Sequence, residues 1–367
     1  MERVTFGTGQ GGGLHTAVCY DGPIQRYSHK GIGRVRPSHS LVSRNWACRY
    51  GQRVSNTIRF GVVSETILDG SAWTDQARRI EAAGINSLLI RDHFSAAAFG
   101  QQLAPFSALA AAAAVTTHLT LGTLVLSNDF RHPALVAHEA ATLHHLSGGR
   151  FELGIGAGWY EPEYQAAGIS FGAAPERIDR LEESLTIMKD LLAGNAVHHS
   201  GRWYQIDGLD LDVLPLPRDV PRLLVGAGGP RMLRLAARHA DIVGLLPSPI
   251  TGTDDHDAAA ARLPSALEQK VRLLQSVAGD RFAKLELSAF ASFNIAPNRR
   301  SATEDLIASR GWSGIDCETV WHMPTIFVGS VAQICEDLDE RHEQFGLSYF
   351  VSPDRDFTTI AEIVASR

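Results

Sequence analysis

The segment LLIRDHF, residues 88–94, ends a hydrophobic run with Arg91, Asp92 and His93. An imidazole titrates near neutral pH, so it can give or take a proton, and a neighbouring carboxylate can orient it. The trio therefore predicts acid–base chemistry at the end of a strand, with His93 as the acid or base and Asp92 beside it. The structural alternative is that Arg91 and Asp92 form a surface pair while His93 caps a loop.

Glycines follow two other β-rich runs. GIGAGWYEPEY, residues 154–164, places repeated glycines before aromatic and acidic residues, which fits either a close backbone approach or a tight turn. Further along, Gly226, Gly228 and Gly229 lead directly into a helix. Unblocked amides at a helix N-terminus bind anions, typically phosphate. Because the segment matches neither GxxxxGK[ST] nor GxGxxG, it favours a mononucleotide phosphate over ATP hydrolysis or a Rossmann dinucleotide site.

Other catalytic and metal-binding patterns are absent from the sequence. There is no HExxH and no GxSxG; His144 and His145 must face different ways on one helix, and His198 and His199 are expected in a loop. We therefore predict no metal site. The four cysteines have no CxxC spacing, so neither a disulfide framework nor a zinc site is predicted, and a cytoplasmic location fits best.

The elements that would position these residues follow a regular alternation of β-rich and helical runs from Ile58 onward. Three helical runs end at Gly84, Gly148 and Gly194. Eight strands are predicted, at residues 58–63, 87–93, 119–126, 151–158, 222–228, 241–247, 285–293 and 347–353. This pattern predicts an α/β protein, a (β/α)8 TIM barrel, in which the active site lies at the carboxyl ends of the strands.

Three longer connections are expected to extend over the C-terminal mouth of the barrel. One lies between the fourth and fifth strands and includes residues 198–221; the others are residues 250–284 and 294–325. Trp159, Tyr160 and Trp203 are candidates for the wall of a substrate site, with exposed-loop or core packing as the alternative for each.

Charge and hydropathy exclude several classes of function. The net charge of −6 argues against a nucleic-acid-binding protein, which needs clustered Lys and Arg. No window approaches the roughly 18 consecutive apolar residues of a membrane span, and no signal-type segment follows a basic start. Membrane insertion and secretion are therefore not expected.

Residues 1–57 differ from the rest. They carry a net charge of +6, which leaves −12 for residues 58–367, and they are rich in Gly, Arg and Ser without sustained periodicity. This profile predicts a disordered basic leader before one domain, 58–367. Two alternatives are an organelle transit peptide and a later translation start, for instance at Val54, in which case the leader is not part of the native protein.

Four stretches together resemble the luciferase-like monooxygenase superfamily of flavin- and deazaflavin-dependent barrels. The similarity spans residues 58–353, and the combination of LSGGRFELGIGAGW with GAGGP is specific to that superfamily. The matching stretches are AAGINSLLIRDHF, LTLGTLVL with RHPALVAHEAATLHHLSGGRFELGIGAGWYEPEY, LLVGAGGPRMLRLAARHADIVGL and FVGSVAQICEDLDERHEQFGLSYFVSP. The order and the last stretch are most similar to the actinobacterial branch that uses coenzyme F420.

The resemblance implies roles for particular residues. Asp92 and His93 would lie beside the tricyclic ring of the cofactor, and a non-prolyl cis peptide at Leu124–Val125 would form a bulge behind it. Ser127 would face the ring edge or the phosphodiester. On the fourth strand, Gly156 and Gly158 would allow a close approach, and the anion loop of Gly226, Gly228 and Gly229 would bind the phosphate.

One position departs from the family pattern. In sugar-phosphate dehydrogenases of this superfamily a Glu follows the glycines of the fourth strand and serves in acid catalysis, whereas this chain has Trp159 there. The departure argues against the same substrate, and neither Glu161 nor Glu163 simply replaces that Glu.

The function implied is an oxidoreductase that passes a hydride between F420 and a small organic substrate. One alternative is an FMN-dependent monooxygenase that uses oxygen and flavin reduced by a partner reductase; another is a non-catalytic cofactor-binding barrel. By analogy, a flavin or F420 reductase is the partner to expect, together with a homodimer through the helices that flank the second and third strands.

Overall fold

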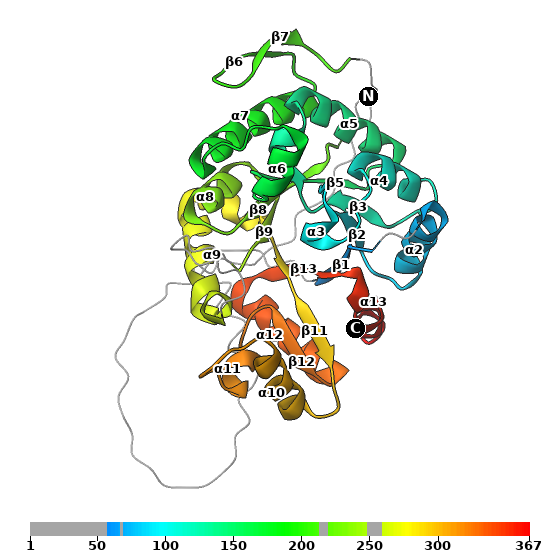
Figure 1. Ribbon diagram of the computed structural model, residues 1–367, viewed down its shortest axis with the longest axis vertical. Coiled ribbons are helices and arrows are strands. Elements are labelled where there is room, and N and C mark those ends of the chain that lie inside the picture. Colours follow the sequence, from blue (N-terminus) through cyan, green and yellow to red (C-terminus); the bar gives the residue numbers. More distant parts are fainter. Residues whose placement is uncertain (1–56, 67–68, 213–218, 248–258) are drawn as a thin grey trace, which may run out of the picture. The chain divides into compact units, whose positions relative to one another are not determined.

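The fold is a closed parallel barrel with helices around it (Figure 1). In this computed structural model the described residues are 57–66, 69–212, 219–247 and 259–367. The predictions made for the leader therefore lie outside the described residues, apart from Thr57. The barrel strands are β1 (Arg59–Ser64), β2 (Ser87–Ile90), β3 (Thr120–Thr123), β5 (Phe151–Gly156), β8 (Arg222–Ala227), β9 (Ile242–Leu245), β10 (Glu286–Phe290) and β13 (Leu347–Pro353).

Hydrogen bonds close the barrel in the order β1, β2, β3, β5, β8, β9, β10, β13 and back to β1, all parallel. A two-residue strand, β4 (Leu126–Ser127), continues β3 and pairs with β5. All eight predicted barrel strands are confirmed, and the predicted TIM barrel with them.

Alternation along the strands builds two apolar layers. On β1, Val62 packs outward with the helices whereas Val63 packs inside the barrel; on β8, Leu223 and Val225 face outward and Leu224 inward. Successive side chains of a strand point to opposite faces, so a strand covered on both sides needs apolar residues at every position. This explains the near-continuous hydrophobic runs in the sequence.

Helices cover the outside of the strands. The helices of 9 or more residues are α2 (Gly70–Ala82), α4 (Pro105–Ala113), α5 (Pro133–Leu146), α7 (Ala174–Leu192), α8 (Pro230–His239), α9 (Pro264–Ala278), α10 (Arg299–Ser309), α12 (Val331–Phe345) and α13 (Phe357–Ala365). Shorter helices are α3 (Ala96–Phe99), α6 (Glu161–Ala167) and α11 (Cys317–Trp321), with 3-10 turns η1 (Asn128–Phe130), η2 (Ala259–Arg262), η3 (Gly279–Lys284) and η4 (Asp354–Asp356). As predicted, Gly84, Gly148 and Gly194 follow helix ends with positive φ, a conformation that favours glycine.

The connections differ in part from the prediction. Residues 264–278 form α9, a helix whose buried Leu267, Val271 and Leu274 recur at helical spacing, so this stretch is not an excursion; residues 250–258 lie outside the described part. The predicted seventh strand, 285–293, divides at Ala291, whose amide donates to Val351 O. Beyond it β11 (Ser292–Ile295) leaves the barrel and pairs with β12 (Ile326–Gly329).

Residues 197–209 form a β-hairpin, so the prediction of a loop for His198 and His199 is wrong. Strands β6 (Val197–Ser200) and β7 (Gln205–Leu209) are antiparallel and lie next to α7 (Figure 1). Glu183 of α7 holds the hairpin, since its carboxylate lies 2.9 Å from His199 Nε2 and accepts the Tyr204 amide at 3.0 Å. The hairpin is therefore fastened to α7, whereas the expectation had this connection over the mouth.

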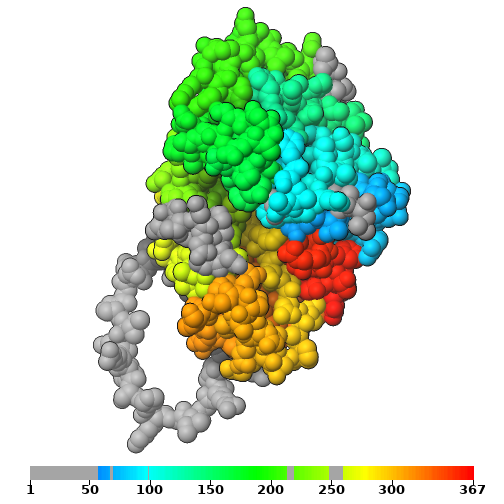
Figure 2. Space-filling view, in the orientation of Figure 1, coloured from blue at the N-terminus to red at the C-terminus, as the bar shows by residue number. Residues whose placement is uncertain are grey.

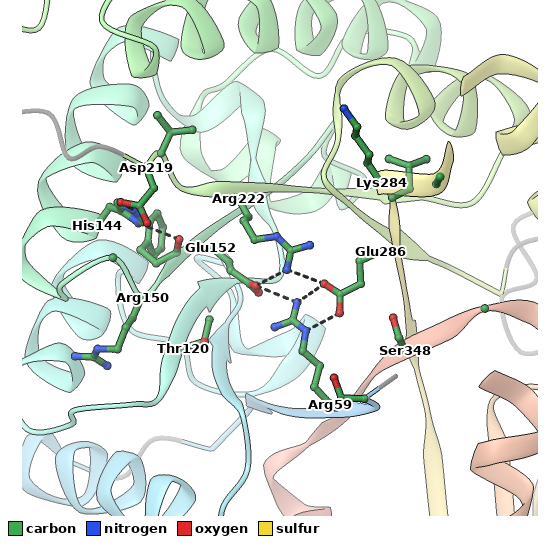
Figure 3. Close-up of a pocket in the computed structure, with 17 residues that line it drawn as sticks. Arg59, Thr120, His144, Arg150, Glu152, Asp219, Arg222, Lys284, Glu286 and Ser348 are labelled. Carbon is green, nitrogen blue, oxygen red and sulfur yellow. Dashed lines mark hydrogen bonds and ion pairs between the residues drawn. The ribbon is translucent and has the colours of Figure 1, made fainter. Parts of the chain in front are cut away.

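Four charged side chains meet at the amino-terminal ends of the barrel strands (Figure 3). Arg59 donates to both Glu286 oxygens, at 2.7 and 2.9 Å, and lies 2.9 Å from Glu152. Arg222 reaches Glu286 at 2.7 Å and Glu152 at 3.5 Å. Burial tends to raise the pKa of Glu286, but hydrogen bonds and charge from Arg59 and Arg222 lower it overall. The cluster joins β1, β5, β8 and β10 at the floor of the barrel.

Candidate active site

Polar side chains gather at the opposite, carboxyl ends of β2, β4 and β5. Strand β2 ends at Ile90, earlier than predicted, and the three residues after it each turn toward a different partner. Arg91 pairs with Glu65, Asp92 with Arg131 and His93 with Glu163. Arg91 and Asp92 are buried and do not pair with each other, so the surface-pair alternative is wrong.

His93 lies against the first turn of α6. Its Nδ1 is 2.9 Å from Glu163 Oε2, and its side chain is 11% exposed. Aromatic rings surround the imidazole, with ring centroids 5.2 Å away at Phe99, 6.1 Å at Trp159 and 6.5 Å at Tyr160. The imidazole is thus oriented by a carboxylate and flanked by rings, an arrangement suited to proton transfer.

Asp92 holds the site's framework together. Its Oδ2 accepts from Arg131 Nη1 at 2.6 Å and from the Ser127 amide at 3.1 Å, while Oδ1 accepts from Arg131 Nη2 at 3.0 Å. Both oxygens are therefore engaged within the protein. The geometry gives Asp92 the task of positioning Arg131 and the end of β4.

The Leu124–Val125 peptide bond is cis, at the place that the resemblance implied. It stands between β3 and β4 and faces the neighbouring strand. A Cβ added at Gly156 would lie 2.9 Å from Val125 Cγ2. Gly156 therefore makes room for this segment of the protein.

Gly158 lies under a hydrogen-bonded pair, Ser127 and Tyr164, whose hydroxyl oxygens are 2.7 Å apart. Its φ is +75°, and an added Cβ would overlap the Tyr164 hydroxyl and lie 2.8 Å from Ser127 Oγ. Burial, reinforced by the nearby charge of Asp129, raises the pKa of Tyr164 to about 12 although the Ser127 hydrogen bond opposes the shift. The phenol is therefore protonated at neutral pH.

The N-terminus of α8 fits an anion. Gly229 is its N-cap residue, no side chain caps the first turn, and an added Cβ at Gly229 would meet no atom within 4 Å. Gly226 and Gly228 lead up to it at the end of β8 and just beyond. Uncapped amides beside open space are what a phosphate group requires.

The three aromatic candidates for the substrate wall lie in two different places. Trp159, 56% exposed, and Tyr160 stand beside His93. Trp203 lies in the turn of the β6–β7 hairpin, where Arg202 and Arg180 face its ring at 4.8 and 5.9 Å. The structure thus brings the first two to the site and places Trp203 against α7.

One cavity adjoins the site, and a second, larger one lies apart from it. A hollow of about 380 Å³ is lined by His93 together with Phe94, Ser95, Gln102 and Leu103. A larger one of about 660 Å³ lies at the barrel floor beside the Arg59 and Glu286 cluster (Figure 3). The floor cavity is at the amino-terminal ends of the strands, so it is separate from the site around His93.

Glu163, Tyr164 and Arg131 are the site residues that sequence reasoning missed. Glu163 and Tyr164 are buried on α6, at 3% and 1% exposure, although they follow the exposed Trp159 and the half-buried Tyr160 in the sequence. A signal was available, since a helix start written EPEY puts an acid and a tyrosine on the face that follows the strand-end glycines. No local pattern in the sequence marks Arg131 as the partner of Asp92.

Comparison with known proteins now adds to this geometry. The family model for luciferase-like monooxygenases matches residues 58–349. The chain belongs to the luciferase-like monooxygenase family. It is accordingly an enzyme of that superfamily and an oxidoreductase, as the resemblance implied.

Individual proteins are also similar. An F420-dependent glucose-6-phosphate dehydrogenase of Nakamurella multipartita is 32% identical over 263 residues, 68% of this chain and 76% of that protein. A solved F420-dependent secondary alcohol dehydrogenase, in complex with an F420–acetone adduct, has a TM-score of 0.65 at 20% identity and covers 84% of this chain and 99% of its own. A long-chain alkane monooxygenase has a TM-score of 0.67 at 16% identity, over 85% of this chain and 91% of its own.

In the part of the chain that the structure describes, no helix is both long and apolar enough to cross a membrane.

Proposed function

We propose that this protein transfers a hydride between coenzyme F420 and a small organic substrate, with His93 as the general acid or base. The support comes from the F420-dependent relative of N. multipartita and from the uncapped N-terminus of α8, which fits the phosphate group of such a cofactor. The bound deazaflavin supplies the hydride chemistry. The chain's own residues bind it, orient the substrate and move the accompanying proton.

The residues divide these tasks. Gly226, Gly228 and Gly229 hold the phosphate at α8, and Leu124, Val125 and Ser127 line the cofactor's side of the barrel end. Trp159 and Tyr160 form an apolar wall next to His93. His93 gives or takes the substrate's proton at Nε2, because Nδ1 is occupied by Glu163.

A second candidate is an FMN-dependent monooxygenase supplied with reduced flavin by a partner reductase. It is favoured by the structural similarity to the long-chain alkane monooxygenase and by the exposed apolar surface of Trp159 and Phe94 near His93. A deazaflavin reacts poorly with oxygen, so the two candidates predict different chemistry.

The deciding experiment is a titration of the full-length chain with F420 and, separately, with FMN, followed by fluorescence quenching. We expect F420 to bind at least tenfold more tightly than FMN, a difference of ~1.4 kcal/mol in binding free energy. Tighter binding of FMN, together with oxygen consumption when reduced flavin is supplied, would replace the F420 proposal by the monooxygenase.

A further inference from the structure

Glu163 is a buried carboxylate with two specific partners. Its side chain is 2% exposed, Oε2 lies 2.9 Å from His93 Nδ1, and Oε1 accepts the Ser95 amide at 2.9 Å. Among the described residues no Lys or Arg forms an ion pair with it. On the surface, the green segment that includes α6 and the cyan segment that follows β2 lie side by side (Figure 2).

These contacts determine where the imidazole carries its proton. A carboxylate only accepts hydrogen bonds, so Nδ1 must be the donor. In neutral His93 the other nitrogen, Nε2, then has a lone pair, and no hydrogen bond within the described part of the chain occupies it. The hydrogen bond from Nδ1 to Glu163 also orients the ring, as happens when a carboxylate holds a catalytic histidine.

We propose that Glu163 is a positioning residue that locks His93 in the Nδ1-protonated tautomer and so keeps Nε2 available to the substrate. This inference rests on the proposed function, in which His93 is the acid or base. When an alcohol is oxidised, its O–H proton passes to Nε2 while the hydride leaves the carbon for oxidised F420. In carbonyl reduction the proton returns from Nε2 to oxygen as the hydride arrives from reduced F420.

Burial gives Glu163 a second effect. When Nε2 accepts a proton, the imidazolium lies next to a desolvated carboxylate, and charge-assisted hydrogen bonds are stronger than neutral ones. Glu163 therefore stabilises the protonated ring that each oxidation leaves behind. The Ser95 amide keeps the carboxylate in place because it engages the oxygen that does not contact the ring.

The test is Glu163→Gln in the full-length protein. Glutamine has the same size and its oxygen can still accept the Ser95 amide, but its NH₂ group then faces Nδ1 and donates to it. We expect the proton to move to Nε2. The readout is the ¹⁵N chemical shifts of the His93 ring at a pH where the ring is neutral, assigned by their loss in His93→Ala.

Two further variants sharpen the test. Glu163→Asp keeps an acceptor and should restore the Nδ1-protonated tautomer at least in part. Glu161→Gln is the matched control, since Glu161 is an exposed carboxylate on the same helix whose partner is Gln165 at 3.1 Å. In this control variant the His93 tautomer and the turnover should equal those of the wild type.

Kinetics with F420 supply the second readout. We expect Glu163→Gln to lower kcat by ~10- to 100-fold with KM and F420 affinity within about twofold, as for loss of a residue that orients another. The inference is overturned if the neutral His93 ring of the wild type carries its proton on Nε2. It is also overturned if Glu163→Gln shows the same His93 tautomer as the wild type. Because the tautomer is measured without substrate or cofactor, this outcome is separate from a failure of F420 binding, which would count against the proposed function.

Discussion

At the scale of single residues, Asp92 shows how a side chain next to a catalytic candidate can serve the framework. It is 4% exposed and accepts hydrogen bonds from Arg131 and from the Ser127 amide. Removing one partner of a buried pair costs much more than removing an exposed one, because the other charge stays buried without compensation. Stability measurements can therefore test the structural role of Asp92 independently of the catalytic role proposed for His93.

We expect Asp92→Ala to lower the free energy of unfolding by ~3 kcal/mol. Chemical denaturation of the full-length protein measures it. The matched control is Asp75→Ala, because Asp75 pairs with Arg78 at 2.8 Å but its side chain is 68% exposed; this change should cost less than ~0.5 kcal/mol. An equal loss of unfolding free energy in the two variants would show that the buried Asp92 contacts stabilise the protein no more than the exposed Asp75 pair does.

At the scale of elements, the turn from β5 into α6 connects the barrel to the residues that surround His93. Gly158 allows this turn because its φ is +75° and because Tyr164 and Ser127 occupy the space where a Cβ would be. This turn places Glu163 2.9 Å from His93 Nδ1 and the centre of the Trp159 ring 6.1 Å from that of the imidazole. One glycine thus determines the position of a short helix and its site residues.

Gly158→Ala should disturb this element more than backbone strain alone explains. We compare it with Gly148→Ala, whose φ of +68° is similar but whose added Cβ would meet no atom within 4 Å. Strain costs ~1–2 kcal/mol in both, and overpacking adds ~1–3 kcal/mol in Gly158→Ala. Unfolding free energies of the two variants measure the difference; losses of the same size would mean that Tyr164 and Ser127 move aside freely.

At the scale of the whole molecule, the barrel is closed at its floor by charge and along its length by apolar packing. Arg59, Glu152, Arg222 and Glu286 come from four strands that lie apart in sequence. The guanidinium of Arg59 also lies 3.5 Å from the centre of the Tyr349 ring inside the barrel. Acid should weaken the contribution of Glu286 to this closure, because the pKa of Glu286 is lower in the folded protein than its ordinary value of 4.5.

A lowered pKa means that the folded state binds the proton less tightly than the unfolded state. Glu286 therefore contributes stability that is complete above about pH 4.5 and is lost as the pH falls through its folded-state value. Glu286→Gln should be less stable than the wild type at pH 7. The difference between their free energies of unfolding, measured in urea, should become smaller below pH 4.5. Glu268→Gln, at an exposed pair with Arg272, is the control and should show no such narrowing. If the difference in free energy of unfolding between Glu286→Gln and the wild type is the same at pH 7 and pH 3, protonation of Glu286 is not coupled to stability.

The sequence by itself determined the barrel and the approximate positions of its strands. Near-continuous apolar runs such as 58–63 and 347–353 can be stable only as strands covered on both sides, and Gly84, Gly148 and Gly194 end helices through local conformation. It also placed His93 at the carboxyl end of β2 and the glycines before α8, because both follow directly from strand ends.

Only the tertiary structure decided which side chains meet. His93 and Glu163 are 70 residues apart, and they contact each other because β2 and β5 both pair with β3, which brings their carboxyl ends within reach of two side chains. The tertiary structure also pairs Asp92 with Arg131 and places Trp203 against α7. Local patterns report burial and chain direction, whereas partners across a barrel depend on strand order and register, which no local pattern contains.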